Sequence, residues 1–128
     1  MFLTFKSQEE RREYGGSDFI EFQFCKMPVK SKIESIVTIE NINHWKPDSL
    51  YVSDYEEFFE IYGKYFDCGY YNNMKNGIVD IYGINYYTSD YVDSIISKIE
   101  NEKPEDYPVI LEWLNKAKEY NGFYILGV

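Results

Sequence analysis

Carboxylates spaced three or four positions apart are the residues of this sequence best suited to do chemistry. They occur as three pairs, Asp54 with Glu57, Glu56 with Glu60, and Asp90 with Asp93. On a helix, this spacing places both members on one face, where two carboxylates can exchange a proton or hold a cation. No histidine accompanies the pairs, and any acidic, solvated helix face shows the same spacing. A charged face is therefore a better interpretation than an acid–base pair.

Two thiols and one imidazole, Cys25, Cys68 and His44, are the other reactive groups. A thiolate nucleophile needs a base or a cation beside it, and nothing in the spacing brings His44 to either cysteine. Two cysteines are too few for a disulfide scaffold, and their spacing is not that of metal ligands. We expect reduced thiols in a cytoplasmic protein without metal or cofactor. One disulfide in an exported form, and a small enzyme using Cys68 or a carboxylate pair, are the alternatives.

The charge of the chain is strongly lopsided. Its 128 residues carry 22 acidic and 13 basic side chains, a net charge of −9. Residues 1–52 hold eight acidic and seven basic groups, whereas residues 53–128 hold fourteen and six. Such a surface repels nucleic-acid phosphates and attracts basic partners, so we expect no direct binding to nucleic acid. No apolar run approaches the roughly 18–20 residues of a membrane span, and the N-terminus does not resemble a signal peptide.

A well-packed core must position these charges, because one residue in five is aromatic. The length suits a single domain over residues 1–128. Helical spacing of apolar residues predicts helices at 53–66, 89–102 and 106–120. The first begins with a capping-box pattern of Ser53 and Glu56, and the last carries Trp113 on its buried face. Pro104 separates the last two helices.

Alternating or β-rich stretches predict strands at 2–6, 18–27, 78–87 and 123–128. Ser7 with Glu10 predicts a short helix that ends at Gly15-Gly16. Residues 31–43 fit either a strand or a short helix, and we favour the helix. Residues 67–77 are expected to form a loop. The fold class is therefore α+β, with one mixed or antiparallel sheet of three to five strands, three main helices packed on it, and the C-terminal strand paired within it.

The C-terminal part of the sequence resembles small bacterial immunity proteins. The resemblance rests on GINYYT (83–88), KPEDY (103–107), LEWLNKA (111–117) and NGFYILGV (121–128), about a third of the chain. Immunity proteins of this kind are cytoplasmic antidotes encoded beside polymorphic or contact-dependent toxins. The resemblance implies stoichiometric binding to a cognate toxin domain, which we expect to be basic, without catalysis or cofactor. It covers core and turn residues, so it assigns no interface residue.

The interface residues are instead predicted from charge and exposure. Acidic groups steer a basic partner and raise its association rate. We expect them on the outer faces of the first two long helices, as Asp54, Glu57, Glu60, Asp90 and Asp93. Tyr70 and Tyr71 lie in a polar loop without periodic apolar partners, so they could anchor an interface or simply pack. An acidic adaptor or nucleic-acid mimic that binds another basic protein would need the same surface.

Overall fold

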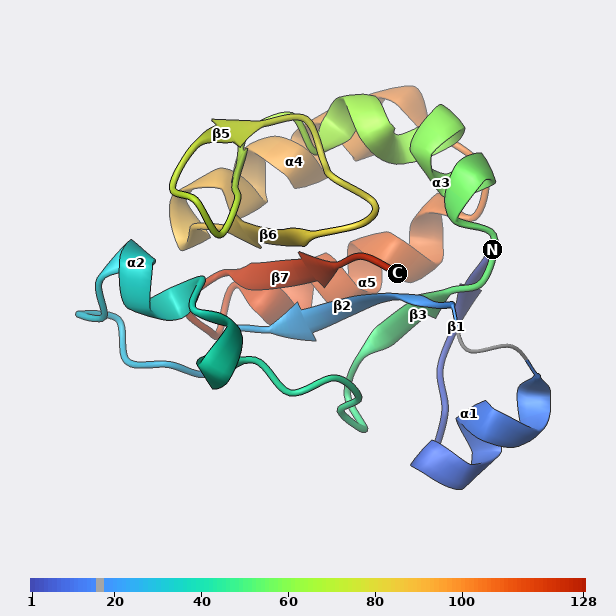
Figure 1. The fold of residues 1–128 in the computed structure, drawn as a ribbon. Coiled ribbons are helices and arrows are strands. Elements are labelled where there is room, and N and C mark those ends of the chain that lie inside the picture. Colours follow the sequence, from blue (N-terminus) through green and yellow to red (C-terminus); the bar gives the residue numbers. More distant parts are fainter. Residues whose placement is uncertain (16–17) are drawn as a thin grey trace.

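The computed structural model describes residues 1–15 and 18–128, and these build one antiparallel sheet with helices on both faces (Figure 1). The sheet has seven strands in the order β1-β3-β2-β7-β6-β4-β5 among the described residues. The strands are β1 (Phe2–Leu3), β2 (Ile20–Phe24), β3 (Leu50–Val52), β4 (Gly69–Tyr70), β5 (Asn76–Gly77), β6 (Ile84–Tyr87) and β7 (Phe123–Leu126). The C-terminal strand β7 lies in the middle of the sheet, between β2 and β6, which confirms its predicted pairing.

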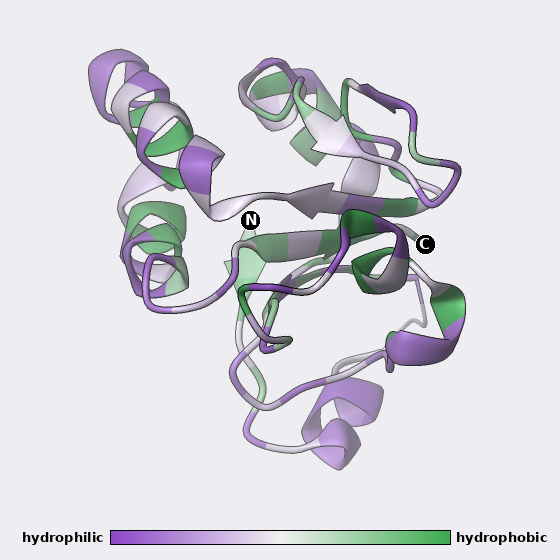
Figure 2. Cartoon of the chain, turned by 90° about the vertical axis from the view of Figure 1, so that its left-hand side faces the viewer, coloured by the Kyte–Doolittle hydropathy of each residue, from purple (hydrophilic) through white to green (hydrophobic). Residues whose placement is uncertain are grey.

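The main helices cover one face of the sheet, and an irregular connection covers the other (Figure 2). The helices are α1 (Gln8–Tyr14), α2 (Ile33–Ile36), α3 (Tyr55–Tyr62), α4 (Ser89–Glu102) and α5 (Tyr107–Ala117). Short 3-10 turns follow α2 at Ile39–Asn41 and α3 at Gly63–Tyr65. None of the helices in the described ranges is long and apolar enough to cross a membrane.

Strand alternation explains the two layers. In β2, Phe22 and Phe24 point toward α3 and α5, while Glu21 and Gln23 point toward the connection between β2 and β3. Trp113 of α5 stacks on Phe24 with ring centroids 4.2 Å apart, so its predicted place in the core is confirmed.

The two long C-terminal helices follow their predicted faces. Four apolar side chains of each helix are buried, Val92, Ile95, Ile96 and Ile99 in α4 and Ile110, Trp113, Leu114 and Ala117 in α5. The helix α4 ends at Glu102, just before Pro104, as predicted. The residues around 31–43 are helical rather than extended, in agreement with the interpretation we favoured.

The short N-terminal helix also begins as predicted. The hydroxyl of Ser7 accepts a hydrogen bond from the backbone N–H of Glu10, at 3.1 Å. The helix ends at Gly15, whose φ of 101° favours glycine. Gly16, the other half of the predicted stop signal, lies outside the described residues.

The predicted number of three to five strands was too low. No strand was predicted at 50–52, and residues 67–77 were predicted to form a loop. The structure has the strands β3, β4 and β5 there, each only two or three residues long. Two or three residues do not reveal an alternating pattern.

The strand predicted at 78–87 begins only at Ile84, because residues 80–83 form a turn. Asn85 holds this turn from inside the sheet. Its side chain accepts from the N–H of Asp80 and donates to the carbonyls of Asp80 and Ile125, at 2.8–2.9 Å.

Candidate protein-binding surface

The N-terminal end of α3 carries a crowded group of acids. The predicted cap, Ser53, is wrong by one residue, because Asp54 accepts the hydrogen bond from the N–H of Glu57 at 3.0 Å. The Glu57 side chain lies beside Glu105, which belongs to the connection between α4 and α5. Partial burial, Glu105 and Asp54 together raise the pKa of Glu57. We call Asp54, Glu57, Glu105 and the neighbouring Asp106 the carboxylate cluster.

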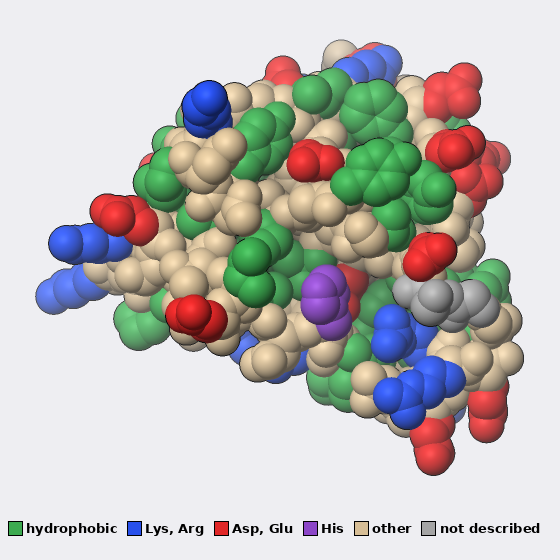
Figure 3. Space-filling model, viewed as in Figure 1, with side chains coloured by type: hydrophobic (Ala, Val, Ile, Leu, Met, Phe, Trp, Pro, Cys, Tyr) green, Lys and Arg blue, Asp and Glu red, His purple; other side chains and the backbone are tan. Residues whose placement is uncertain are grey.

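Little positive charge balances the carboxylate cluster. The N-terminal ammonium of Met1 lies 2.8 Å from Asp106 and slightly offsets the rise in the Glu57 pKa. Lys64, the basic residue that follows α3, is paired with Glu102 at 2.9 Å. Figure 3 shows acidic side chains gathered at the upper right, over α3 and the α4–α5 connection. The cluster is therefore a place where a partner could supply missing cations.

The predicted acids on α4 lie elsewhere. Asp90 and Asp93 belong to the first turns of α4, whereas the carboxylate cluster lies beyond its last turn. Fourteen helical residues span about 20 Å, so one small contact cannot include both ends. Asp93 is also paired with Lys118 at 2.9 Å. The structure thus brings Asp54 and Glu57 together and keeps Asp90 and Asp93 apart from them. Glu60 is exposed on α3, one turn beyond the cluster.

Tyr70 and Tyr71 are held by the hairpin that contains them. Tyr70 pairs with Tyr86 across β4 and β6 and packs against buried side chains on the connection side of the sheet, which include Ile36 and Tyr124. The Tyr71 hydroxyl donates to the carbonyl of Ile78, and the backbone N–H of Tyr71 donates to the carbonyl of Lys75. Both side chains are half-buried. Packing therefore accounts for much of their surface, although each keeps an exposed part.

An aromatic pair of one exposed and one half-buried tyrosine lies at the N-terminal end of α3. Tyr82 is 66% exposed, and its ring centroid is 5.9 Å from that of Tyr55, the first residue of α3. Tyr82, partial burial and the acids Glu56 and Asp18 raise the pKa of Tyr55. Sequence reasoning missed Tyr82 because it assigned residues 78–87 to one strand. The sequence feature that indicates an exposed turn is the presence of Asp80 and Gly83, two turn-forming residues, around Tyr82.

Neither cysteine has the lowered pKa of an activated nucleophile. Burial raises the pKa of the Cys25 thiol, and burial with the nearby Asp67 raises that of Cys68. A raised pKa leaves less thiolate at neutral pH. His44 is exposed and lines a small cavity with Arg11 and Phe19. Within residues 1–15 and 18–128, no group of three or more His, Cys, Asp or Glu side chains could hold a metal ion.

Comparison of the chain with protein-family models, curated proteins and solved structures finds no match. Function must therefore be argued from the surface itself.

Proposed function

We propose that this protein is an immunity protein that neutralises a cognate toxin in the cytoplasm by stoichiometric binding. The carboxylate cluster is the observation that carries the proposal. At neutral pH the crowding around Glu57 opposes folding of the free protein, because partial burial and the neighbouring Glu105 and Asp54 raise the pKa of Glu57. A basic side chain of a partner would remove that repulsion on binding.

The surroundings of the cluster suit a protein partner. Tyr55 and Tyr82 offer large, rigid contact areas with polar tips, which is typical of residues that dominate binding energy. Tyrosine faces also attract lysine and arginine side chains. Acids and aromatic rings thus frame the N-terminal end of α3, where both can contact the same basic segment.

The overall charge supports the same partner. Most of the negative charge lies after residue 52, on the part of the chain that includes α3, α4 and α5. This field would accelerate encounter with a basic toxin domain and weaken as salt is added. Binding over the toxin's active site would then block its substrate without catalysis by the antidote.

Co-purification with the toxin domain encoded by the neighbouring gene tests this proposal. We expect a one-to-one complex by size-exclusion chromatography with light scattering, and loss of toxin activity at equimolar ratio. Separate elution of the two proteins, with full toxin activity, would contradict the proposal.

A further inference from the structure

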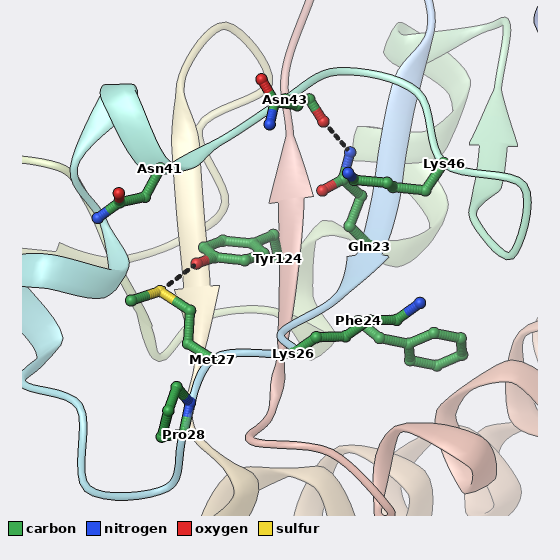
Figure 4. Close-up of a pocket in the computed structure, with 9 residues that line it drawn as sticks. All are labelled: Gln23, Phe24, Lys26, Met27, Pro28, Asn41, Asn43, Lys46 and Tyr124. Carbon is green, nitrogen blue, oxygen red and sulfur yellow. Dashed lines mark hydrogen bonds between the residues drawn. The ribbon is translucent and has the colours of Figure 1, made fainter.

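A cavity lies on the face of the sheet opposite the three main helices, beneath the connection between β2 and β3 (Figure 4). Its volume is about 400 Å³, within the range of small-molecule sites. Its floor comes from β2, β7 and the start of the connection, and its roof from residues 41–46. The polar groups around it include three carboxamides and a lysine, Gln23, Asn41, Asn43 and Lys46.

A buried carboxylate fixes the roof. Glu21 is 2% exposed and accepts hydrogen bonds from the N–H groups of Trp45 and Lys46, at 2.7 and 2.9 Å. The Ser49 hydroxyl donates to the same carboxylate at 2.7 Å. Because these three donors belong to the connection, Glu21 holds the connection against the sheet. The cavity is therefore formed before any ligand arrives.

Gln23 presents one unused acceptor to the cavity. Its side chain is 4% exposed, and its Nε2 donates to Glu21 at 2.8 Å and to the carbonyl of Asn43 at 2.7 Å. These bonds fix the orientation of the amide. Its Oε1 accepts no hydrogen bond from any described residue and is directed away from the Asn43 carbonyl, on the side of Tyr124 (Figure 4). This oxygen is accessible from the cavity and can accept a hydrogen bond from a ligand N–H or O–H.

Lys46 gives the cavity a positive charge. Its ammonium forms no ion pair with any described residue, whereas the ammonium of Lys26 is paired with Asp48 at 2.7 Å. No aspartate or glutamate lines the cavity among the described residues. A cation-lined cavity in a protein of net charge −9 indicates an anionic ligand.

We infer that this cavity binds a small phosphate ester of a hydroxylated ring, the chemistry shared by sugar phosphates and nucleoside monophosphates. The phosphate faces Lys46, and ring hydroxyls or base N–H groups donate to Gln23 Oε1. The amide of Asn41 donates to Ser35 at 2.7 Å, which leaves its oxygen for a second ligand donor. Met27 and Tyr124 form an apolar wall for the ring. A cation would be repelled by Lys46, and an apolar ligand would leave the amides unpaired. This inference does not depend on toxin binding.

Nuclear magnetic resonance titration of the ¹⁵N-labelled protein tests the inference. The probes are AMP, CMP, ribose 5-phosphate and inorganic phosphate, added separately. We expect the side-chain amide signals of Gln23 and Asn43 to shift with AMP, CMP or ribose 5-phosphate, and inorganic phosphate to bind at least about tenfold more weakly. A response to ribose 5-phosphate as strong as to the nucleotides would assign recognition to the sugar phosphate, and a stronger response to AMP or CMP would assign it to the nucleotide.

Two lysine variants decide the role of charge. Lys46→Met keeps the backbone N–H that contacts Glu21 and should weaken binding at least about tenfold. The matched control Lys30→Met changes an exposed lysine on the same connection, outside the cavity, and should change affinity by less than about twofold. The inference is overturned if no ester shifts the Gln23 signal, if inorganic phosphate binds as well as the esters, or if Lys46→Met binds like the wild type.

Discussion

The two acidic ends of the helical layer share a sequence pattern and differ in their surroundings. Asp54 and Glu57 have the same spacing as Asp90 and Asp93. At the first end, Glu105 from another connection joins the pair, and the pKa of Glu57 rises. At the second end, Lys118 neutralises Asp93 at 2.9 Å. The contrast shows that the spacing of acids defines a face, while tertiary neighbours decide whether that face lacks positive charge.

Reversal of charge at the two ends should separate them most clearly. Replacing Glu57 and Glu105 together by lysine should weaken toxin binding roughly 100-fold at low salt, because two central charges become repulsive. Replacing Asp90 and Asp93 together by lysine should weaken it less than about fivefold, through the general field alone. Surface plasmon resonance measures the affinity of each double variant for the toxin. Equal losses for the two double variants would remove the distinction between the ends.

Removal of the cap should have a smaller effect, confined to the first end. Asp54→Ala deletes the hydrogen bond to the N–H of Glu57 and should lower the free energy of unfolding by about 1 kcal/mol. Asp90→Ala should change it by less than about 0.5 kcal/mol, because α4 has no side-chain cap. Urea unfolding compares the two variants. A larger loss for Asp90→Ala would show that the ends had been assigned the wrong roles.

Neutralisation of Glu57 should reveal the repulsion directly. The folded state raises the Glu57 pKa, so its contribution to stability is present at low pH and is lost as pH rises through the folded pKa. Glu57→Gln should therefore be more stable than the wild type at neutral pH and no more stable well below the carboxylate pKa. Urea midpoints measured from acid to neutral pH follow this difference. A wild type that is the more stable protein at neutral pH would contradict the proposed crowding.

Loss of the ion pair at the second end should have the smallest effect. Lys118 and Asp93 are both exposed, and exposed ion pairs contribute little to the free energy of unfolding. Lys118→Met should change the free energy of unfolding by less than about 0.5 kcal/mol, measured by the same urea method. The variant should also leave toxin binding within about twofold, although it frees Asp93. Markedly tighter binding would show that an unpaired acid at the second end also contacts the toxin.

The helices were predictable because their patterns are long. Fourteen residues of α4 repeat the apolar spacing often enough to fix both type and face, and α5 does the same with Trp113. The strands β3, β4 and β5 were not predicted, because two or three residues are too few to show an alternation of apolar and polar side chains. Their pairing depends on neighbours from distant parts of the chain.

The candidate sites were predictable only in part, for a related reason. The local spacing that links Asp54 to Glu57 is visible in the sequence, but the approach of Glu105 follows from the packing of α3 beside the α4–α5 connection. Alternation placed Glu21 and Gln23 on one face of β2 without indicating that the β2–β3 connection buries them. Local patterns therefore predict faces, and long-range packing decides which faces become sites.

Calorimetry with the neighbouring gene's toxin domain, at low and at high salt, tests the central claim most directly. Three proteins are compared, the wild type, Glu57→Lys, and the control Glu34→Lys. The control makes the same change in net charge at an exposed residue of α2, on the opposite face of the sheet. We predict tight one-to-one binding by the wild type that weakens with salt, a loss of at least about tenfold for Glu57→Lys, and nearly full binding by Glu34→Lys. No heat from the wild type at either salt, or equal losses for the two variants, would contradict the account.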